Sequence, residues 1–260
     1  MLSGKEREVQ QREQLFLDVA RKILLEEGYP EVSVSRVAEL TGFSRGTAYL
    51  QFGSKEELIT ALGLQCRRRL LGVIERAARF DGRPRERMLA IGEAIVQYVG
   101  LYPNDQRILK IIDSELILAK VGDERRAEMN DHDVRMFALV LEIISEAVDV
   151  GDLVLRAGAT PEGLCLAFWM MMDGAFAAGM GSAPLEDVGI ANPVAEAVRS
   201  SHYLLDGYGW RPLSQEWDYE ATATRIRAHL THAFNAADSD GHSVSYSLFQ
   251  TATKEEARDV

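Results

Sequence analysis

Apolar side chains recur every three or four positions through most of the chain, which is the spacing of an α-helix that buries one face. Stretches in which apolar and polar residues alternate one by one, as in a half-buried strand, are nearly absent. The sequence therefore predicts an all-α fold. Beyond residue 83, helices are expected at 84–101, 104–120, 124–150, 161–180, 193–207 and 215–236, with proline and glycine between them and a loop at 181–193.

The first part of the chain has clear helix boundaries. An apolar stripe predicts a first helix that ends at Gly28, a residue suited to a left-handed cap. Ser33, Ser44 and Ser54 each precede a further helical segment, and a serine hydroxyl in that position can accept a hydrogen bond from a free backbone N–H. The last of these segments is long and is expected to continue to about Arg79.

Residues 33–52 have the pattern of a helix, a tight turn and a second helix. Gly42 can supply the turn, and the small Ala38 allows the two helices to approach closely. Apolar side chains that can hold the pair together are Val37, Phe43 and Phe52. The second helix is too polar and too small on one side to be buried, so this side suits the major groove of DNA. The pattern predicts a helix-turn-helix.

Residues 12–62 resemble the N-terminal DNA-binding domain of the TetR family of transcriptional regulators. The resemblance is carried by Arg12, Ala20, Gly28-Tyr29, Ser33, Val37-Ala38, Gly42, Ser44, Gly46-Thr47, Tyr49, Phe52, Ser54-Lys55-Glu56 and Leu58. Phe43, Ala48 and Gln51 replace residues that are more common in the family, which affects the operator sequence more than the fold. The resemblance implies a three-helix DNA-binding domain over residues 9–69, an all-helical effector-binding and dimerisation domain over 70–236, and a polar tail over 237–260.

The expected DNA contacts come from the serine before the first helix of the motif, from the second helix with the serine before it, and from the start of the helix that follows. They are Ser33, Ser44, Arg45, Gly46, Thr47, Tyr49, Leu50, Gln51 and Lys55. The hydroxyl of Tyr49 suits a phosphate, and Lys55 lies at a helix N-terminus, where free N–H groups also attract phosphate. The run Arg67–Arg69 could touch the DNA backbone, although a solvated helix face is the preferred interpretation.

The later half of the chain contains its most apolar stretch, residues 168–172. The family resemblance implies that the helix at 161–180 and the last helix form a four-helix dimer interface. Candidates for this interface are Leu164, Phe168, Met171, Ala175, Ile226, Leu230 and Phe234. Candidates for an effector pocket, among which Glu115 and Asp173 fit a helix surface equally well, are Tyr98, Glu115, Phe137, Trp169, Met172, Asp173 and Phe176.

Two alternative functions stay open. Gly42-x-Ser44-x-Gly46 matches the nucleophile motif of α/β-hydrolases, although that motif needs a strand before the serine and the preceding residues have helical spacing. The second alternative is a helical small-molecule binding protein with a vestigial DNA-binding head. No cofactor or metal is expected, because His229 and His232 lie one turn apart without a third ligand at a recognisable spacing.

Charge and composition refine this interpretation. The chain carries 29 Lys and Arg against 40 Asp and Glu, a net charge of −11, which by itself argues against a nucleic-acid partner. However, the first 80 residues contain 13 basic and 11 acidic side chains, so the acidity belongs to the remainder. Two widely spaced cysteines fit a reducing compartment. The polar first residues do not have the apolar segment of a secretory signal. The apolar run at 163–172 is too short to cross a bilayer.

Together these features predict a cytoplasmic transcription regulator rather than an enzyme. Its expected partners are a second copy of itself, a palindromic double-stranded operator and a largely apolar small-molecule effector, with no membrane partner. The simplest mechanism is repression that the effector relieves by changing the separation of the two DNA-binding heads.

Overall fold

The fold is known from a computed structural model, which describes residues 3–181 and 184–238. The described residues form helices and no strand, which confirms the all-α prediction. In chain order the helices are α1 (Gly4–Glu26), α2 (Val34–Thr41), α3 (Arg45–Gln51), α4 (Lys55–Ala78), α5 (Pro84–Leu101), α6 (Pro103–Ile112), α7 (Glu115–Leu118), α8 (Asp123–Asp149), α9 (Pro161–Met180), α10 (Pro193–Gly207) and α11 (Tyr219–Asp238).

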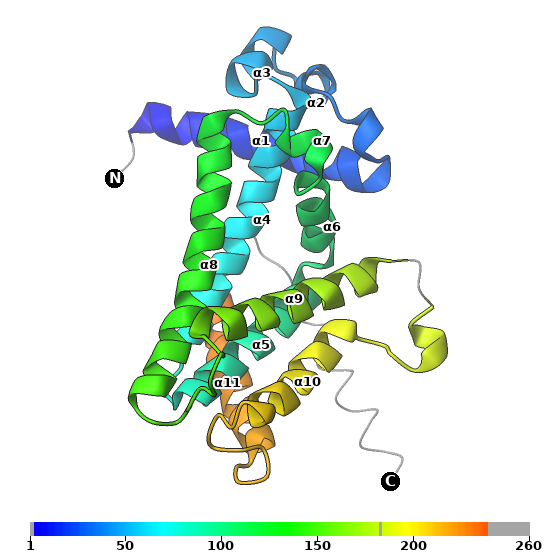
Figure 1. Ribbon diagram of the computed structural model, residues 1–260. Coiled ribbons are helices and arrows are strands. Elements are labelled where there is room, and N and C mark those ends of the chain that lie inside the picture. Colours follow the sequence, from blue (N-terminus) through cyan, green and yellow to red (C-terminus); the bar gives the residue numbers. More distant parts are fainter. Residues whose placement is uncertain (1–2, 182–183, 239–260) are drawn as a thin grey trace.

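Helices α1, α2 and α3, with the first turns of α4, form one end of the molecule, which we call the head (Figure 1). The serine hydroxyls of Ser33, Ser44 and Ser54 accept hydrogen bonds from backbone N–H groups three residues further on, at 3.2, 3.1 and 3.1 Å. Gly42 ends α2 with φ of 75°, a left-handed conformation that favours glycine. The helix boundaries predicted for the head therefore follow from local backbone chemistry.

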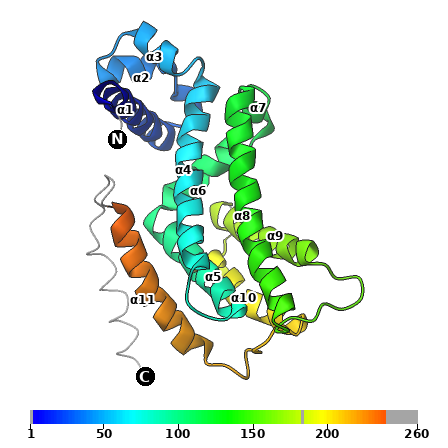
Figure 2. The same ribbon diagram turned by 90° about the vertical axis from the view of Figure 1, so that its left-hand side faces the viewer.

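Helix α4 leaves the head and runs through the remaining helices, which we call the body, where it packs against α5, α6 and α8 (Figure 2). The approach of α6 is unusually close at Gly63. A Cβ atom added there would lie 2.2 Å from Cδ1 of Ile112, so a larger residue would push the two helices apart. The position of α6 therefore depends directly on that of α4.

The body is built in layers around α4 and α5. Helices α9 and α10 pack against each other and cross α8 and α5, whereas α11 lies on the opposite side of α4 and α5 (Figures 1 and 2). The α10–α11 connection is held by Arg85, whose fully buried guanidinium donates to the Asp206 carboxylate at 2.6 Å and to the backbone carbonyl of His202 at 3.2 Å. This anchor fixes α10 against the start of α5.

Two helix boundaries differ from the sequence prediction. The helix expected at 104–120 is two helices, since α6 ends at Ile112 and the hydroxyl of Ser114 bonds back to the carbonyl of Ile111 at 2.7 Å. The last helix begins at Tyr219 rather than at residue 215, and Asp218 accepts a hydrogen bond from its first turn at 2.9 Å. The segment 239–260, which contains most of the predicted polar tail, lies outside the described residues.

Helix α9 is apolar around most of its circumference. Its length and its mean hydropathy of 1.4 are sufficient for a membrane span by those two measures alone, and 22% of its most apolar window is buried within the chain. The expectation that no segment could span a bilayer was based on the uncharged run at 163–172. Helix α9 is longer than this run and extends beyond it at both ends. An apolar helix that the chain itself leaves partly uncovered is also typical of a protein interface.

Candidate nucleic-acid interface and ligand cavity

Helix α3 presents its side chains to solvent at the tip of the head. Ser44, Arg45, Gly46, Tyr49 and Leu50 are all exposed. Leu50 is 91% exposed, the highest value among the large apolar residues of the described chain. Among residues 3–181 and 184–238, nothing covers this exposed leucine and the hydroxyl and guanidinium groups beside it, and their chemistry suits base edges and phosphates.

The back of α3 is fixed to the rest of the head. Ala48 is buried, and the rings of Phe43 and Phe52 meet Phe16 of α1 edge to face, with centroids 5.3 and 6.1 Å apart. The Tyr49 hydroxyl lies 3.3 Å from the hydroxyl of Ser35 on α2. These contacts hold the exposed face in one orientation, and they agree with the predicted roles of Phe43 and Phe52 in packing.

Several of the expected contact residues have structural partners within the head, and Tyr49 has been described above. Ser33 caps α2, as described above. The Thr47 hydroxyl lies 2.8 Å from that of Ser44, and the Gln51 amide donates to the carboxylate of Glu13 at 3.1 Å. Whether these residues touch DNA stays a prediction.

Lys55 lies at the start of α4, which follows α3 in the chain. Its ammonium group donates to the backbone carbonyl of Pro30 at 3.2 Å and lies 3.9 Å from the ring centre of Tyr29. Partial burial, opposed by the nearby carboxylates of Glu56 and Glu31, lowers the pKa of Lys55. Since an ammonium group has three N–H donors, Lys55 could still donate to a phosphate while it keeps the carbonyl.

The arginine run on α4 lies within the body, where the side chains of Arg67 and Arg69 are 11% and 25% exposed and that of Arg68 is 59% exposed. Arg67 pairs with Asp113 at 2.5 Å and with Asp133, and Arg68 pairs with Glu128. These ion pairs tie α4 to the loop after α6 and to α8. The interpretation of the run as a solvated face therefore fits Arg68 and is corrected for Arg67 and Arg69, whose side chains are mostly buried against acidic residues distant in sequence.

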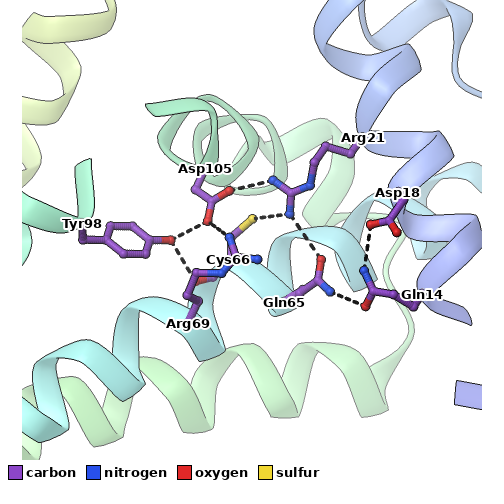
Figure 3. Close-up of polar contacts among 8 residues, drawn as sticks. All are labelled: Gln14, Asp18, Arg21, Gln65, Cys66, Arg69, Tyr98 and Asp105. Carbon is purple, nitrogen blue, oxygen red and sulfur yellow. Dashed lines mark hydrogen bonds and ion pairs between the residues drawn. The ribbon is translucent and has the colours of Figure 1, made fainter. Parts of the chain in front are cut away.

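Arg69, the third arginine of the run, belongs to a buried network that we call the Asp105 hub (Figure 3). The Asp105 carboxylate on α6 is 2% exposed and accepts from Arg21 of α1 at 2.7 Å, from Arg69 of α4 at 2.5 Å and from the Tyr98 hydroxyl of α5 at 2.7 Å. The pKa of Tyr98 is raised well above its usual value, first by burial and then by Asp105. One carboxylate thus connects the head to three helices of the body.

The hub extends further into the head through a chain of amides. Arg21 also donates to the amide oxygen of Gln65 at 3.3 Å, Gln65 donates to Gln14 at 2.7 Å, and Gln14 donates to Asp18 at 2.8 Å (Figure 3). Polar contacts therefore join α1 to α4 and, through Asp105, to α6. A displacement of α6 or α4 would change the contacts that hold α1 in the head.

The body contains a cavity of about 190 Å³ between α4, α5, α6, α8, α9 and α10. Five of the predicted pocket residues line it, namely Phe137, Trp169, Met172, Asp173 and Phe176. Phe137 and Trp169 stack with their ring centres 4.7 Å apart. Tyr98, in contrast, belongs to the hub, and the side chain of Glu115 lies outside the described part of the structure. Binding of an effector by the lining residues stays a prediction.

The polar residues of the cavity are mostly paired with one another. Arg67 is shared by Asp113 and Asp133, and Lys110 lies 3.0 Å from Asp173. Burial and the neighbouring Asp113 raise the pKa of Asp133, against the effect of Arg67. Apart from Asp173, the sequence did not indicate these ion-paired residues as part of the cavity, nor the polar lining residues Gln106, Ser201 and His202. The helical spacing of Gln106 with Leu109, Lys110 and Asp113 is the signal that could have identified the α6 residues.

The residues expected at a dimer interface lie mainly inside the chain. Leu164 and Ala175 of α9 are buried, and Phe168 and Met171 line the cavity. Ile226 and Leu230 of α11 are 0% and 1% exposed because α11 packs on α5 and α4. The side chain of Phe234 lies outside the described residues. The expectation is therefore corrected for Leu164, Ala175, Ile226 and Leu230, since side chains already buried within one chain cannot cover a second. For the partly buried Phe168 and Met171, and for Phe234, it stays a prediction.

The residues that α9 exposes to solvent are neighbours in sequence of the expected interface residues, one or two positions away from them. Leu166 is 50% exposed and Met170 is 64% exposed, and Gly163, Gly174 and Ala177 continue this exposed stripe. On the neighbouring α10, Tyr203 is 73% exposed. An exposed apolar stripe interrupted by small residues is the kind of surface on which a second helix can pack closely.

The hydrolase alternative finds no support in the geometry around Ser44. This residue follows a helix and a glycine turn, and its hydroxyl caps α3. A nucleophile elbow requires a strand directly before the serine, and residues 3–181 and 184–238 contain none.

Comparisons with known proteins agree with this geometry. Residues 16–62 match the family described as bacterial regulatory proteins, tetR family. An uncharacterized HTH-type transcriptional regulator of Mycobacterium bovis is 29% identical over 143 residues, which cover 55% of this chain and 65% of that protein.

Two solved structures share the fold. A TetR/AcrR-family transcriptional regulator from Thermobifida fusca superposes with a TM-score of 0.59 at 20% identity, covering 76% of this chain and 98% of that one. The transcriptional regulator FadR from Bacillus subtilis, solved in complex with stearoyl-CoA, superposes with a TM-score of 0.54 at 19% identity, covering 75% and 98%. At these identities the likeness establishes a common all-helical architecture.

Proposed function

Because the chain is a TetR-family transcriptional regulator with an N-terminal DNA-binding domain, we propose that it acts as a homodimeric repressor that a small molecule releases from its operator. In this proposal residues 9–69 bind DNA and residues 70–236 bind the effector and the second copy, in the cytoplasm. The observation that carries the proposal is the face of α3, which is held rigidly from behind and which none of the described residues covers on its outer side.

On DNA, the exposed face of α3 would lie in the major groove. Arg45 can donate to a guanine edge or a phosphate, and Leu50 can contact the methyl group of thymine. Ser44 and Tyr49 offer hydroxyls to phosphates, and Lys55, which donates one N–H to the Pro30 carbonyl, has further donors for a phosphate at the end of the same surface. Since the first 80 residues carry almost balanced charge, affinity would depend on these placed groups more than on bulk attraction.

Two copies of the chain would associate through the outer sides of α9 and α10. Burial of Leu166, Met170 and Tyr203 in a two-fold interface removes apolar surface from water, and the small residues of α9 permit close helix contact. The two-fold axis would then present two copies of α3 to successive major grooves of a palindromic operator. This interface also accounts for an apolar α9 that the single chain leaves largely uncovered.

The effector would occupy the cavity. Its lining is mostly aliphatic and aromatic, which favours an apolar ligand, and a protein of the same fold has been solved with the acyl compound stearoyl-CoA. Helix α6 lines the cavity with one face and carries Asp105 on another, so an occupant that displaces α6 would act on Arg21 of the head. By thermodynamic linkage, such an effector must bind more weakly to the DNA-bound protein.

The test is DNA binding by variants of the α3 face. The full-length protein selects its operator from random duplexes, and mobility shifts then compare Arg45→Ala, Tyr49→Ala and Leu50→Ala with Leu40→Ala, a change of another exposed apolar residue, on α2. Each of the three α3 variants should lose about tenfold or more in affinity, the loss expected for about 1–3 kcal/mol per specific contact, while the control keeps the affinity of the wild type.

Equal affinities in all variants would contradict the assignment of α3 as the recognition helix. Failure of the wild type to enrich any duplex at low salt would instead favour a binding protein with a vestigial head.

A further inference from the structure

Two faces of helix α6 have different surroundings. Asp105, Ile108 and Ile112 face α4 and the hub and are 2%, 0% and 0% exposed. Gln106, at the start of the other face, lines the cavity together with Leu109, Lys110 and Asp113. The helical period of 3.6 residues places these two sets side by side on one short helix. A contact made in the cavity at Gln106 is therefore one residue away from the carboxylate that binds the head.

Gln106 is a buried polar side chain without a partner. It is 7% exposed, and its amide nitrogen Nε2 has no hydrogen-bond partner among the described residues. The cavity around it is lined largely by apolar side chains such as Leu70, Ile95 and Leu109. A buried N–H group that is left unpaired is costly, and almost all such groups in folded proteins find an acceptor.

The charged groups of the cavity indicate what kind of acceptor is missing. Both cations that line it already have carboxylate partners, Arg67 with Asp113 and Asp133 and Lys110 with Asp173. A free carboxylate on the ligand would have to compete with these partners and lose its own hydration. A neutral carbonyl oxygen can accept from the Gln106 amide without either cost.

We propose that Gln106 is the polar recognition residue of the cavity, donating from Nε2 to the carbonyl oxygen of a neutral, otherwise apolar effector such as a ketone, ester, thioester or amide. This inference rests on the proposed effector-binding function of the cavity. The hydrogen bond holds the ligand against α6, and the adjacent Asp105 passes a shift of this helix to Arg21 in the head.

His202 provides a matched comparison on the other side of the cavity. It also lines the cavity, and its ring nitrogen Nδ1 is buried without a partner. However, its ring already packs against Tyr219, with centroids 4.7 Å apart. Burial and Arg85 lower the pKa of His202, so its ring is neutral near pH 7. Replacement of His202 thus removes an unpaired polar group from the same cavity without touching α6.

The experiment measures binding of two probes of nearly equal shape, acetophenone and ethylbenzene, which differ in the carbonyl oxygen. Isothermal titration calorimetry is carried out on the full-length wild type and on Gln106→Leu, Gln106→Glu and His202→Phe, each with its fold verified by circular dichroism. The wild type and His202→Phe should bind acetophenone more tightly than ethylbenzene by roughly tenfold, the value of one hydrogen bond that satisfies a buried donor. Both Gln106 variants should lose this preference while still binding ethylbenzene.

Two results would overturn the inference while leaving the proposed function intact: an unchanged preference for acetophenone in Gln106→Leu and Gln106→Glu, or loss of the preference in His202→Phe alone. If neither probe binds the wild type, the cavity is not a ligand site and both proposals fail. If the preference follows Gln106 but acetophenone at saturation leaves operator binding unchanged in mobility shifts, the recognition role stands and the release mechanism fails.

Discussion

Replacement of Asp105 by asparagine is the most direct test of the connection between the head and the body. The substitution keeps the shape of the side chain but removes its charge and turns one of its two acceptor atoms into a donor. At present one carboxylate oxygen accepts from Arg21 and the other from Arg69 and Tyr98. The amide oxygen of the asparagine can accept from the donors on one side. On the other side its NH2 group would face a donor and could not accept a hydrogen bond from it.

The expected loss in the free energy of unfolding follows from the burial of each partner of Asp105. Tyr98 is fully buried, so a hydroxyl left without this acceptor would cost about 1 kcal/mol, given that it can still donate to the carbonyl of Cys66 at 3.2 Å. The side chains of Arg21 and Arg69 are 21% and 25% exposed and can be partly rehydrated, so each charged contact would contribute about 1 kcal/mol, below the range for fully buried pairs. Because the asparagine keeps an acceptor oxygen on one side, the loss is that of the contacts on the other side, about 1–2 kcal/mol, which corresponds to a fall of roughly 2–8 °C in Tm for a chain of this size.

Thermal and denaturant unfolding followed by circular dichroism measure this loss, with Tyr98→Phe and Arg21→Met as partial perturbations of the same hub. Tyr98→Phe should cost about 1 kcal/mol, because it removes a single hydroxyl. In a double-mutant cycle, Arg21→Met should cost less in the Asp105→Asn background than in the wild type, since the pair that it breaks is already weakened. A Tm for Asp105→Asn within 1 °C of the wild type, or a cycle with purely additive costs, would refute the role of the hub.

Two further predictions concern the cysteines and the outer side of α9. Burial raises the pKa of Cys66 to about 12 and that of Cys165 to about 11, so at pH 8 roughly one thiol in a thousand or fewer is the reactive thiolate. Ellman's reagent should therefore label neither cysteine until the protein unfolds, and stoichiometric labelling of the native protein within minutes would contradict this. Met170→Glu places a charge on the proposed dimer surface and should yield a monomer by light scattering, whereas Val134→Glu, at a 65% exposed position on α8, should not. A dimeric Met170→Glu protein would exclude that surface.

The helix-turn-helix could be predicted from the sequence because it depends on interactions between residues close in the chain. A serine cap acts three residues ahead, and the turn needs one glycine with positive φ. The apolar stripes of the head helices point to a shared core because each helix has a single apolar side. The helix boundaries of the helix-turn-helix can thus be predicted from Ser33, Gly42 and Ser44 and the few residues that follow each of them.

The body shows where local patterns stop being sufficient. Helix α9 is apolar on nearly all sides, so its periodicity does not distinguish Leu164, which faces its own chain, from Met170, which faces outward. Helix α11 has the predicted apolar stripe, and this stripe packs against α5 of the same chain. The sequence of α11 alone does not show whether the partner of the stripe belongs to the same chain or to a second copy. The choice between an internal and an intermolecular partner is made by the relative placement of whole helices.

The same distinction applies to the polar residues. The sequence by itself determined an all-helical protein with a DNA-binding head, since caps, turns and periodicity act over a few residues. Only the tertiary structure decided that Arg69 meets a carboxylate on α6, that Tyr98 is part of a buried hub, and that Gln106 faces a cavity without a partner. The physical reason is that electrostatic and hydrogen-bond partners are set by distance in space, and residues as far apart as 21 and 105 become neighbours only when the helices have packed.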